Sequence, residues 1–98
     1  MQSNITLEVK KDLCRSMASN LSTLREKAKL SQEELAGKLG LSRQTISVIE
    51  MGKRDMQWST FSVLIMFFAN DHEIKKIMVA MGLVNETIEE VFNIGNKN

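Results

Sequence analysis

Apolar residues recur mostly every three or four positions along the chain, a spacing typical of amphipathic helices. The first periodic stretch starts at residue 7, and its apolar positions are Leu7, Leu13, Met17, Leu21, Leu24 and Ala28. This pattern fits either one long helix or two helices divided near Ser19 and Asn20, in which case Asn20 would cap the second helix.

Two shorter helices joined by a glycine turn are predicted within residues 31–52. Ser31 and Glu34 have the spacing of a capping box, so the first of these helices should begin at Gln32. Its buried face is expected to consist of Leu35, Ala36 and Leu39. Gly40 is placed to end the helix, because glycine adopts the left-handed backbone conformation of a helix end without steric penalty.

The second helix of this pair should begin after Ser42, whose hydroxyl can cap it, and end at Gly52. Ile46 and Ile49 then point back at the first helix. The outer face is left with Arg43, Gln44, Ser47, Val48 and Met51. Caps and periodicity therefore predict a helix-turn-helix, a unit whose second helix commonly enters the major groove of DNA.

Specific residues strengthen this prediction. They are Leu24-Arg25-Glu26, Leu30-Ser31-Gln32-Glu33-Glu34-Leu35-Ala36, Gly40-Leu41-Ser42-Arg43-Gln44-Thr45-Ile46-Ser47 and Ile49-Glu50-Met51-Gly52-Lys53-Arg54. From about residue 20 to 69 the chain resembles Cro/C1-type (XRE family) helix-turn-helix proteins, the phage-repressor type. The resemblance implies an all-α, lambda-repressor-like DNA-binding domain. Its first helix would correspond to residues 21–29, everything before that would be an N-terminal addition, and the chain would also carry C-terminal helical additions.

The family's base-contacting positions correspond here to Arg43, Gln44, Ser47 and Val48. The chemistry of these side chains suits that role, since arginine can donate two hydrogen bonds to guanine and glutamine can pair in both directions with adenine. Val48 offers an apolar contact to a thymine methyl group. Thr45 is a weaker candidate because it turns toward the core.

Phosphate contacts are expected on both sides of this face. Gln32 begins the first motif helix, where its side chain and the free backbone N–H groups can hold a phosphate. Lys53 and Arg54 follow the recognition helix and should also reach phosphates. Met51 departs from the family, which usually has an asparagine there that often contacts a phosphate.

Arg25 and Glu50 are predicted to form a structural ion pair. Glu50 lies on the core side of the recognition helix, where an unpaired carboxylate would be costly. In the family that this chain resembles, residues at these two positions form a partly buried pair that ties the first helix to the third. The alternative is that both side chains are exposed.

A fourth helix is predicted from Trp58 to Asn70, capped by Ser59 or Asp55. It is apolar nearly all the way round, through Phe61, Val63, Leu64, Ile65, Met66, Phe67, Phe68 and Ala69. Such a helix needs cover on most sides. Either the C-terminal helices or a second subunit would supply it.

Two C-terminal helices complete the predicted bundle. The first holds Ile74, Ile77, Met78 and Met81 between a cap at Asn70 or Asp71 and an end at Gly82. The second starts at Asn85 and ends near Gly95, with its apolar positions at Ile88, Val91 and Phe92. We therefore expect one compact all-α domain of five to six helices over residues 7–95, its core motif being 31–52, with flexible tails at 1–6 and 96–98.

Composition agrees with one small helical domain. The chain has 98 residues, 43% of them hydrophobic and 26% charged, and no proline, which excludes global disorder. The net charge of +1 is unevenly spread, because residues 1–70 carry a balance of +3 and residues 71–98 a balance of −2. Basic charge is thus in excess in the segment that contains the proposed DNA-binding helix.

Enzymatic functions find no support in the sequence. Cys14 and His72 lie far apart with no orienting partner, and there is no glycine-rich phosphate loop, paired-carboxylate motif or metal-ligand cluster. No apolar stretch reaches membrane-spanning length and no signal peptide is evident. We expect a cytoplasmic, non-enzymatic protein without cofactor, metal or membrane partner.

Two functions remain after these exclusions. The first is a sequence-specific regulator of transcription, a repressor that binds double-stranded DNA as a homodimer on a palindromic operator. The second is an antitoxin or adaptor-type interaction module, in which the apolar fourth helix and the C-terminal helices bind a partner protein.

Overall fold

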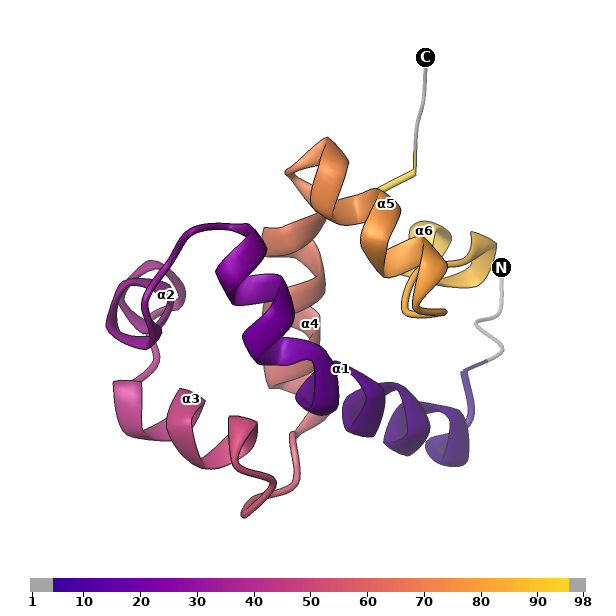
Figure 1. Ribbon diagram of the computed structural model, residues 1–98. Coiled ribbons are helices and arrows are strands. Elements are labelled where there is room, and N and C mark those ends of the chain that lie inside the picture. The colour runs from indigo at the N-terminus through magenta and orange to yellow at the C-terminus, as the bar shows by residue number, and fades with distance from the viewer. Residues whose placement is uncertain (1–4, 96–98) are drawn as a thin grey trace.

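Six helices account for the regular secondary structure in the computed structural model, which describes residues 5–95 (Figure 1). They are α1 (Leu7–Lys27), α2 (Gln32–Leu39), α3 (Arg43–Glu50), α4 (Trp58–Ala69), α5 (His72–Ala80) and α6 (Glu86–Phe92). The described residues between them form turns and loops. The expected all-α fold of five to six helices is confirmed.

The N-terminal stretch forms one unbroken helix, α1, of 21 residues. Asn20 does not cap a second piece, because its side-chain amide donates to the backbone carbonyl of Ser16 at 2.8 Å, within the same helix. Thr6, expected in a flexible tail, instead caps α1 by accepting a hydrogen bond from the Val9 N–H at 3.2 Å. Residues 1–4 and 96–98 of the expected tails lie outside the described residues. Helix α1 begins at Leu7, the first position of the predicted helical pattern, although this side chain is 69% exposed.

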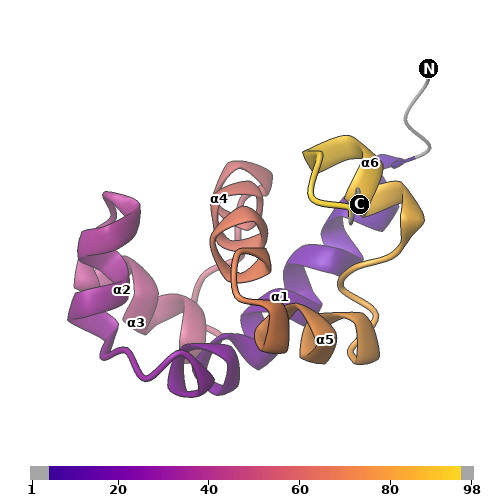
Figure 2. The same ribbon diagram turned by 90° about the horizontal axis from the view of Figure 1, so that it is seen from above.

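Helix α1 runs through the middle of the molecule (Figures 1 and 2) and packs against α3 and α4. At one end of the molecule α2 and α3 pack together, and at the other lie α5 and α6. Helix α4 packs against both α1 and α5. The core is continuous through these contacts because Met17, Leu21 and Leu24 of α1 are fully buried.

The chain's own helices cover most of α4. Its buried residues are Phe61, Leu64, Ile65 and Phe68, whereas Val63 and Met66 remain 36% and 43% exposed. The predicted cap by Ser59 or Asp55 is wrong, because α4 begins after Gln57 and has no side-chain cap hydrogen bond. Packing of the first turn fixes this start instead, since the rings of Trp58 and Phe61 stack with centroids 4.7 Å apart.

The C-terminal helices close the other end of the core. Asp71 caps α5 by accepting hydrogen bonds from the backbone N–H groups of Glu73 and Ile74. Helix α6 ends at Phe92, before the expected Gly95, because Asn93 adopts the left-handed conformation at φ +54°.

Contacts from α6 fasten it to the rest of the bundle. The ring of Phe92 lies 5.8 Å from that of Trp58 and 6.1 Å from that of Phe61, measured between centroids. The Lys75 ammonium donates to the backbone carbonyl of Ile94 at 2.8 Å and pairs with Glu89 at 3.2 Å. Helix α6 is therefore an integral part of the fold.

Candidate nucleic-acid interface

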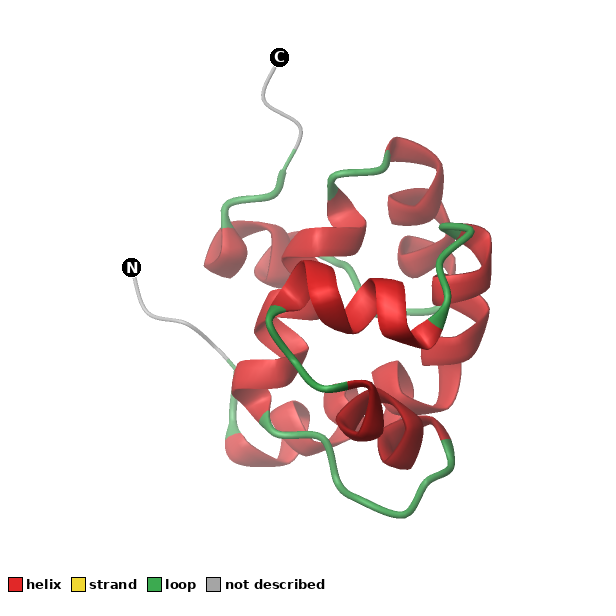
Figure 3. Cartoon of the chain, turned by 90° about the vertical axis from the view of Figure 1, so that its left-hand side faces the viewer, coloured by secondary structure: helices red, strands yellow, loops and turns green. Residues whose placement is uncertain are grey.

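Two side-chain caps and one glycine define the ends of α2 and the start of α3. The Ser31 hydroxyl accepts from the Glu34 N–H at 3.0 Å while the Glu34 carboxylate accepts from the Ser31 N–H at 2.8 Å, which completes the predicted capping box. Gly40 ends α2 at φ +70°, a conformation that residues with a Cβ rarely adopt. Ser42 then caps α3 by accepting from the Thr45 N–H at 3.1 Å. The two helices are consequently joined by a short capped turn, on the side of the molecule that faces the viewer in Figure 3.

Helix α3 has one buried face and one outward face. Ile46 and Ile49 are buried against the rest of the motif. On the outward side Arg43 and Gln44 are exposed, Ser47 and Val48 are half-buried, and Met51 just beyond the helix is 56% exposed. All four predicted base-contacting residues, which are Arg43, Gln44, Ser47 and Val48, are thus at least partly accessible.

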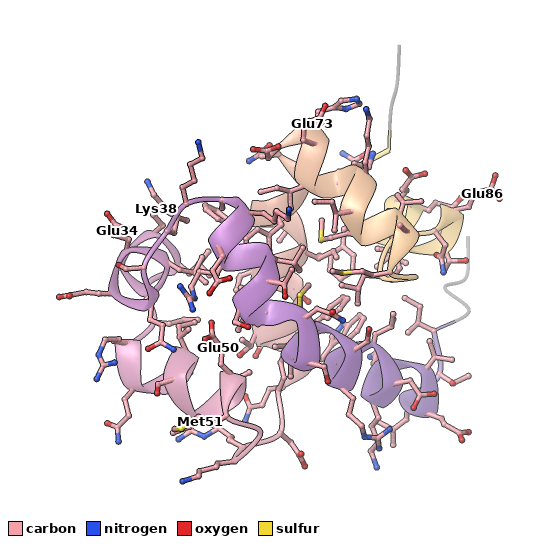
Figure 4. The ribbon with its side chains drawn as sticks, in the orientation of Figure 1. Glu34, Lys38, Glu50, Met51, Glu73 and Glu86 are labelled. Carbon is pink, nitrogen blue, oxygen red and sulfur yellow. The ribbon has the colours of Figure 1, made fainter. Side chains whose placement is uncertain are left out.

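The other end of α3 is tied to α1 through Glu50, which points inward in Figure 4. Arg25 donates two hydrogen bonds to the Glu50 carboxylate, from Nε at 2.7 Å and from Nη2 at 3.1 Å. Nη1 of the same arginine donates to the Leu30 carbonyl at 2.9 Å. The two charged side chains are only 13% and 8% exposed, so the partly buried pair expected from the family resemblance is present.

This geometry sets the ionisation of Glu50. Burial alone would raise the pKa of its carboxyl group, but the hydrogen bonds from Arg25 and Gln32 and the arginine charge hold the pKa below its usual value. Glu50 is therefore ionised at neutral pH and the pair carries full charge.

Gln32 links this ion pair to the outward face. Its Nε2 donates to Glu50 at 2.9 Å, and its Oε1 accepts from Nη1 of Arg43 at 3.2 Å. Hydrogen bonds thus connect Arg25, Glu50, Gln32 and Arg43 in series. The sequence did not predict the contacts of Gln32. Glu50 lies 18 residues and Arg43 11 residues further along the chain, so these side chains meet only once α2 and α3 have packed together.

The remaining predicted phosphate-contacting residues lie beyond α3. Lys53 and Arg54 are exposed in the loop before α4. Figure 4 shows Glu73 and Glu86, which belong to the acidic C-terminal segment, on the opposite side of the molecule from Met51. Charge is thus separated in space as well as in sequence.

Cys14 lies outside this surface and is 6% exposed. Burial raises the pKa of its thiol, which disfavours the reactive thiolate. Residues 5–95 contain no group of three or more potential metal ligands, and none of their helices is long and apolar enough to cross a membrane.

A capped helix pair that presents an exposed polar and cationic helix face, with further cations beside it, is typical of helix-turn-helix DNA-binding proteins. Comparison with known families agrees with this class. Residues 21–55 match the model of the helix-turn-helix family HTH_3, in agreement with the resemblance to Cro/C1-type (XRE family) proteins seen in the sequence. The match supports a DNA-binding transcription regulator in general terms. No curated protein and no solved structure matches the chain.

Proposed function

We propose that the protein is a sequence-specific transcription regulator that binds double-stranded DNA as a homodimer and represses promoters by occupying a palindromic operator. The observation that carries this proposal is the outward face of α3, where Arg43, Gln44, Ser47 and Val48 are accessible on a helix whose opposite face is buried. Such a face can enter the major groove without any rearrangement of the core.

Within this face, Arg43 and Gln44 carry most of the base specificity. Arg43 donates two hydrogen bonds to a guanine, and Gln44 exchanges two with an adenine. The contact between Arg43 and Gln32 limits the number of rotamers that the arginine samples before it meets DNA. Less side-chain entropy is then lost on binding. Ser47 and Val48 add a polar contact and a methyl contact to neighbouring bases.

Phosphates on either side of the groove are held by residues flanking α3. Lys53 and Arg54 supply charge from the loop that follows it. The side-chain amide of Gln32 is engaged with Glu50 and Arg43, so we assign its phosphate contact to the backbone N–H groups at the start of α2.

A homodimer follows from the small size of the interface. Helix α3 has eight residues and reads only a few base pairs. A two-fold pair places two such helices about 34 Å apart, one turn of duplex, and doubles the number of contacts. Repression then needs no effector domain, because an occupied promoter excludes polymerase.

Selection of bound duplexes from a random pool tests this function. We expect a two-fold symmetric consensus with half-sites about 10 base pairs apart. Arg43→Ala and Gln44→Ala should each relax the preference at one position per half-site, at a cost of roughly 1–3 kcal/mol per base contact. Lys76→Ala is the control. Its side chain is exposed on α5, so this variant should keep the wild-type consensus. An unchanged consensus in both α3 variants would refute the assignment of base readout.

The interaction-module alternative relied on an uncovered fourth helix. The structure removes most of that basis, because Phe61, Leu64, Ile65 and Phe68 are buried by the chain itself. Ultracentrifugation without DNA still distinguishes the two functions, since a homodimer at micromolar concentration favours the regulator.

A further inference from the structure

Helix α1 extends well beyond the part of the chain that matches the helix-turn-helix family. The matched segment begins at residue 21, whereas α1 begins at Leu7. The first two-thirds of α1 are therefore additional to the family motif. They run past the C-terminal end of α3 and the loop after it (Figure 1).

A cleft of about 620 Å³ separates this additional part of α1 from the end of α3 and the loop that follows. Lys11 and Arg15 line it from α1, four residues apart and hence on one face of the helix. Met51, Gly52 and Arg54 line it from the other side. The cleft thus begins where the recognition helix ends.

The cations of this cleft are available to a ligand. Lys11 and Arg54 form no ion pair with any residue of 5–95 and are exposed. Arg15 pairs with Asp12 at 2.9 Å, but both side chains are about 70% exposed. An ion pair so open to water contributes little stability, so a phosphate can replace Asp12 at small cost.

Negative charge in the cleft is limited. Its acidic lining residues are Glu50 and Asp55. The carboxylate of Glu50 is neutralised by Arg25, which leaves Asp55 in the lining and Asp12 beside Arg15 against three cations. The field in the cleft therefore favours an anion.

We propose that the additional part of α1 is a second phosphate-binding element, in which Lys11 and Arg15 act with Arg54 to hold the DNA backbone beyond the end of the recognition helix. This rests on the proposed DNA-binding function and adds a surface to it. With α3 in the major groove, the backbone strand that passes Lys53 and Arg54 continues into the cleft. The contact adds affinity without adding sequence preference, because phosphates carry no base information.

The salt dependence of binding tests this proposal. Affinity for the selected duplex is measured between 50 and 300 mM NaCl for the wild type, for the double variant Lys11→Ala/Arg15→Ala and for the double variant Lys27→Ala/Lys76→Ala. Both double variants remove two positive charges from exposed positions, but Lys27 and Lys76 do not line the cleft. The two double variants therefore have the same net charge, so the long-range effect of net charge on DNA affinity is the same in both.

Loss of two phosphate contacts per protomer, four per bound homodimer, should reduce the slope of log affinity against log salt by about 3.6 in the Lys11/Arg15 variant, with no change in the consensus sequence. The control variant should keep the wild-type slope. Equal slopes for the two double variants would overturn the proposal. Ethylation interference provides a second readout, since phosphates outside the half-site should lose their effect only in the Lys11/Arg15 variant.

The outcomes also separate this proposal from the proposed function. If the wild type selects a consensus that Arg43→Ala changes, yet Lys11→Ala/Arg15→Ala keeps the wild-type slope, the function stands and the α1 surface is refuted. If the wild type binds no duplex with sequence preference, both fail. Circular dichroism of each variant establishes that all three proteins are folded.

Discussion

The paired charges of Arg25 and Glu50 show how one contact holds the helix-turn-helix to the rest of the molecule. Arg25 belongs to α1 and Glu50 ends α3, so the pair fixes the position of the recognition helix against the central helix. Because water reaches little of either side chain, removal of one partner leaves the other charge without compensation. Arg25 therefore matters more to stability than its charged neighbours on α1.

Arg25→Ala should lower the free energy of unfolding by about 3 kcal/mol, since it leaves a buried carboxylate unpaired. Thermal melts should show a fall of at least 10 °C for a domain of this size, at about 4–8 °C per kcal/mol. Lys27→Ala, two positions along and exposed, should change stability by less than about 0.5 kcal/mol. Equal effects of the two substitutions would sink the structural role of the pair.

The same pair makes part of the stability depend on pH. The pKa of Glu50 is held below its usual value in the folded protein, so ionisation of this group favours folding. That contribution is fully present above the usual glutamate pKa of 4.5 and is lost as the pH falls through the lower folded value. The stability difference between wild type and Arg25→Ala should accordingly shrink between pH 7 and pH 3. Urea titrations at both values measure it, and a difference that grows with acid would contradict the assignment.

The ion pair and the site residues differ in how far the sequence predicts them. Arg25 and Glu50 could be paired from the family resemblance and from the core position of Glu50. The hydrogen bonds that Gln32 makes to Glu50 and Arg43 could not, because they depend on the separation of α2 and α3 after packing. The contacts of Arg43, Gln44, Ser47 and Val48 with DNA stay a prediction until binding is measured.

The elements of the chain are defined mainly by short-range signals. Ser31, Ser42, Asp71 and Asn85 each cap the helix that follows, as their positions before periodic apolar stretches predict. The exceptions lie where packing decides instead. Helix α4 starts without a cap because its first turn is held by aromatic stacking, and α6 ends at an asparagine in place of a glycine.

Capping of α3 can be tested directly, because the chain also offers a serine in the first turn of another helix that does not cap it. Ser42→Ala should cost about 1 kcal/mol of stability, as it removes the acceptor for the Thr45 N–H. Ser59→Ala, in the uncapped first turn of α4, should change stability by less than about 0.5 kcal/mol. Denaturant titrations compare the two variants, and a larger loss for Ser59→Ala would argue against the observed caps.

At the scale of the whole molecule, the sequence indicated the helical class and the number of helices but left two questions open. One was whether α1 is continuous, and the other was what covers the apolar α4. Both depend on long-range packing. The core formed by Met17, Leu21 and Leu24 makes one continuous helix more favourable than a break, and α1 together with α5 covers α4.

The unbroken α1 joins the DNA-binding end of the molecule to the C-terminal end through a single hydrogen-bonded helix. Neither end can therefore unfold completely while the middle of α1 stays folded. The backbone amides near Met17 and Leu21 should consequently exchange with deuterium only when the whole domain unfolds. Their exchange free energy should equal that of global unfolding in denaturant. Faster exchange there than in α2 would show that the two ends unfold separately. A substitution that loosens α6 against Trp58 should then also accelerate exchange in α3, on the far side of the molecule.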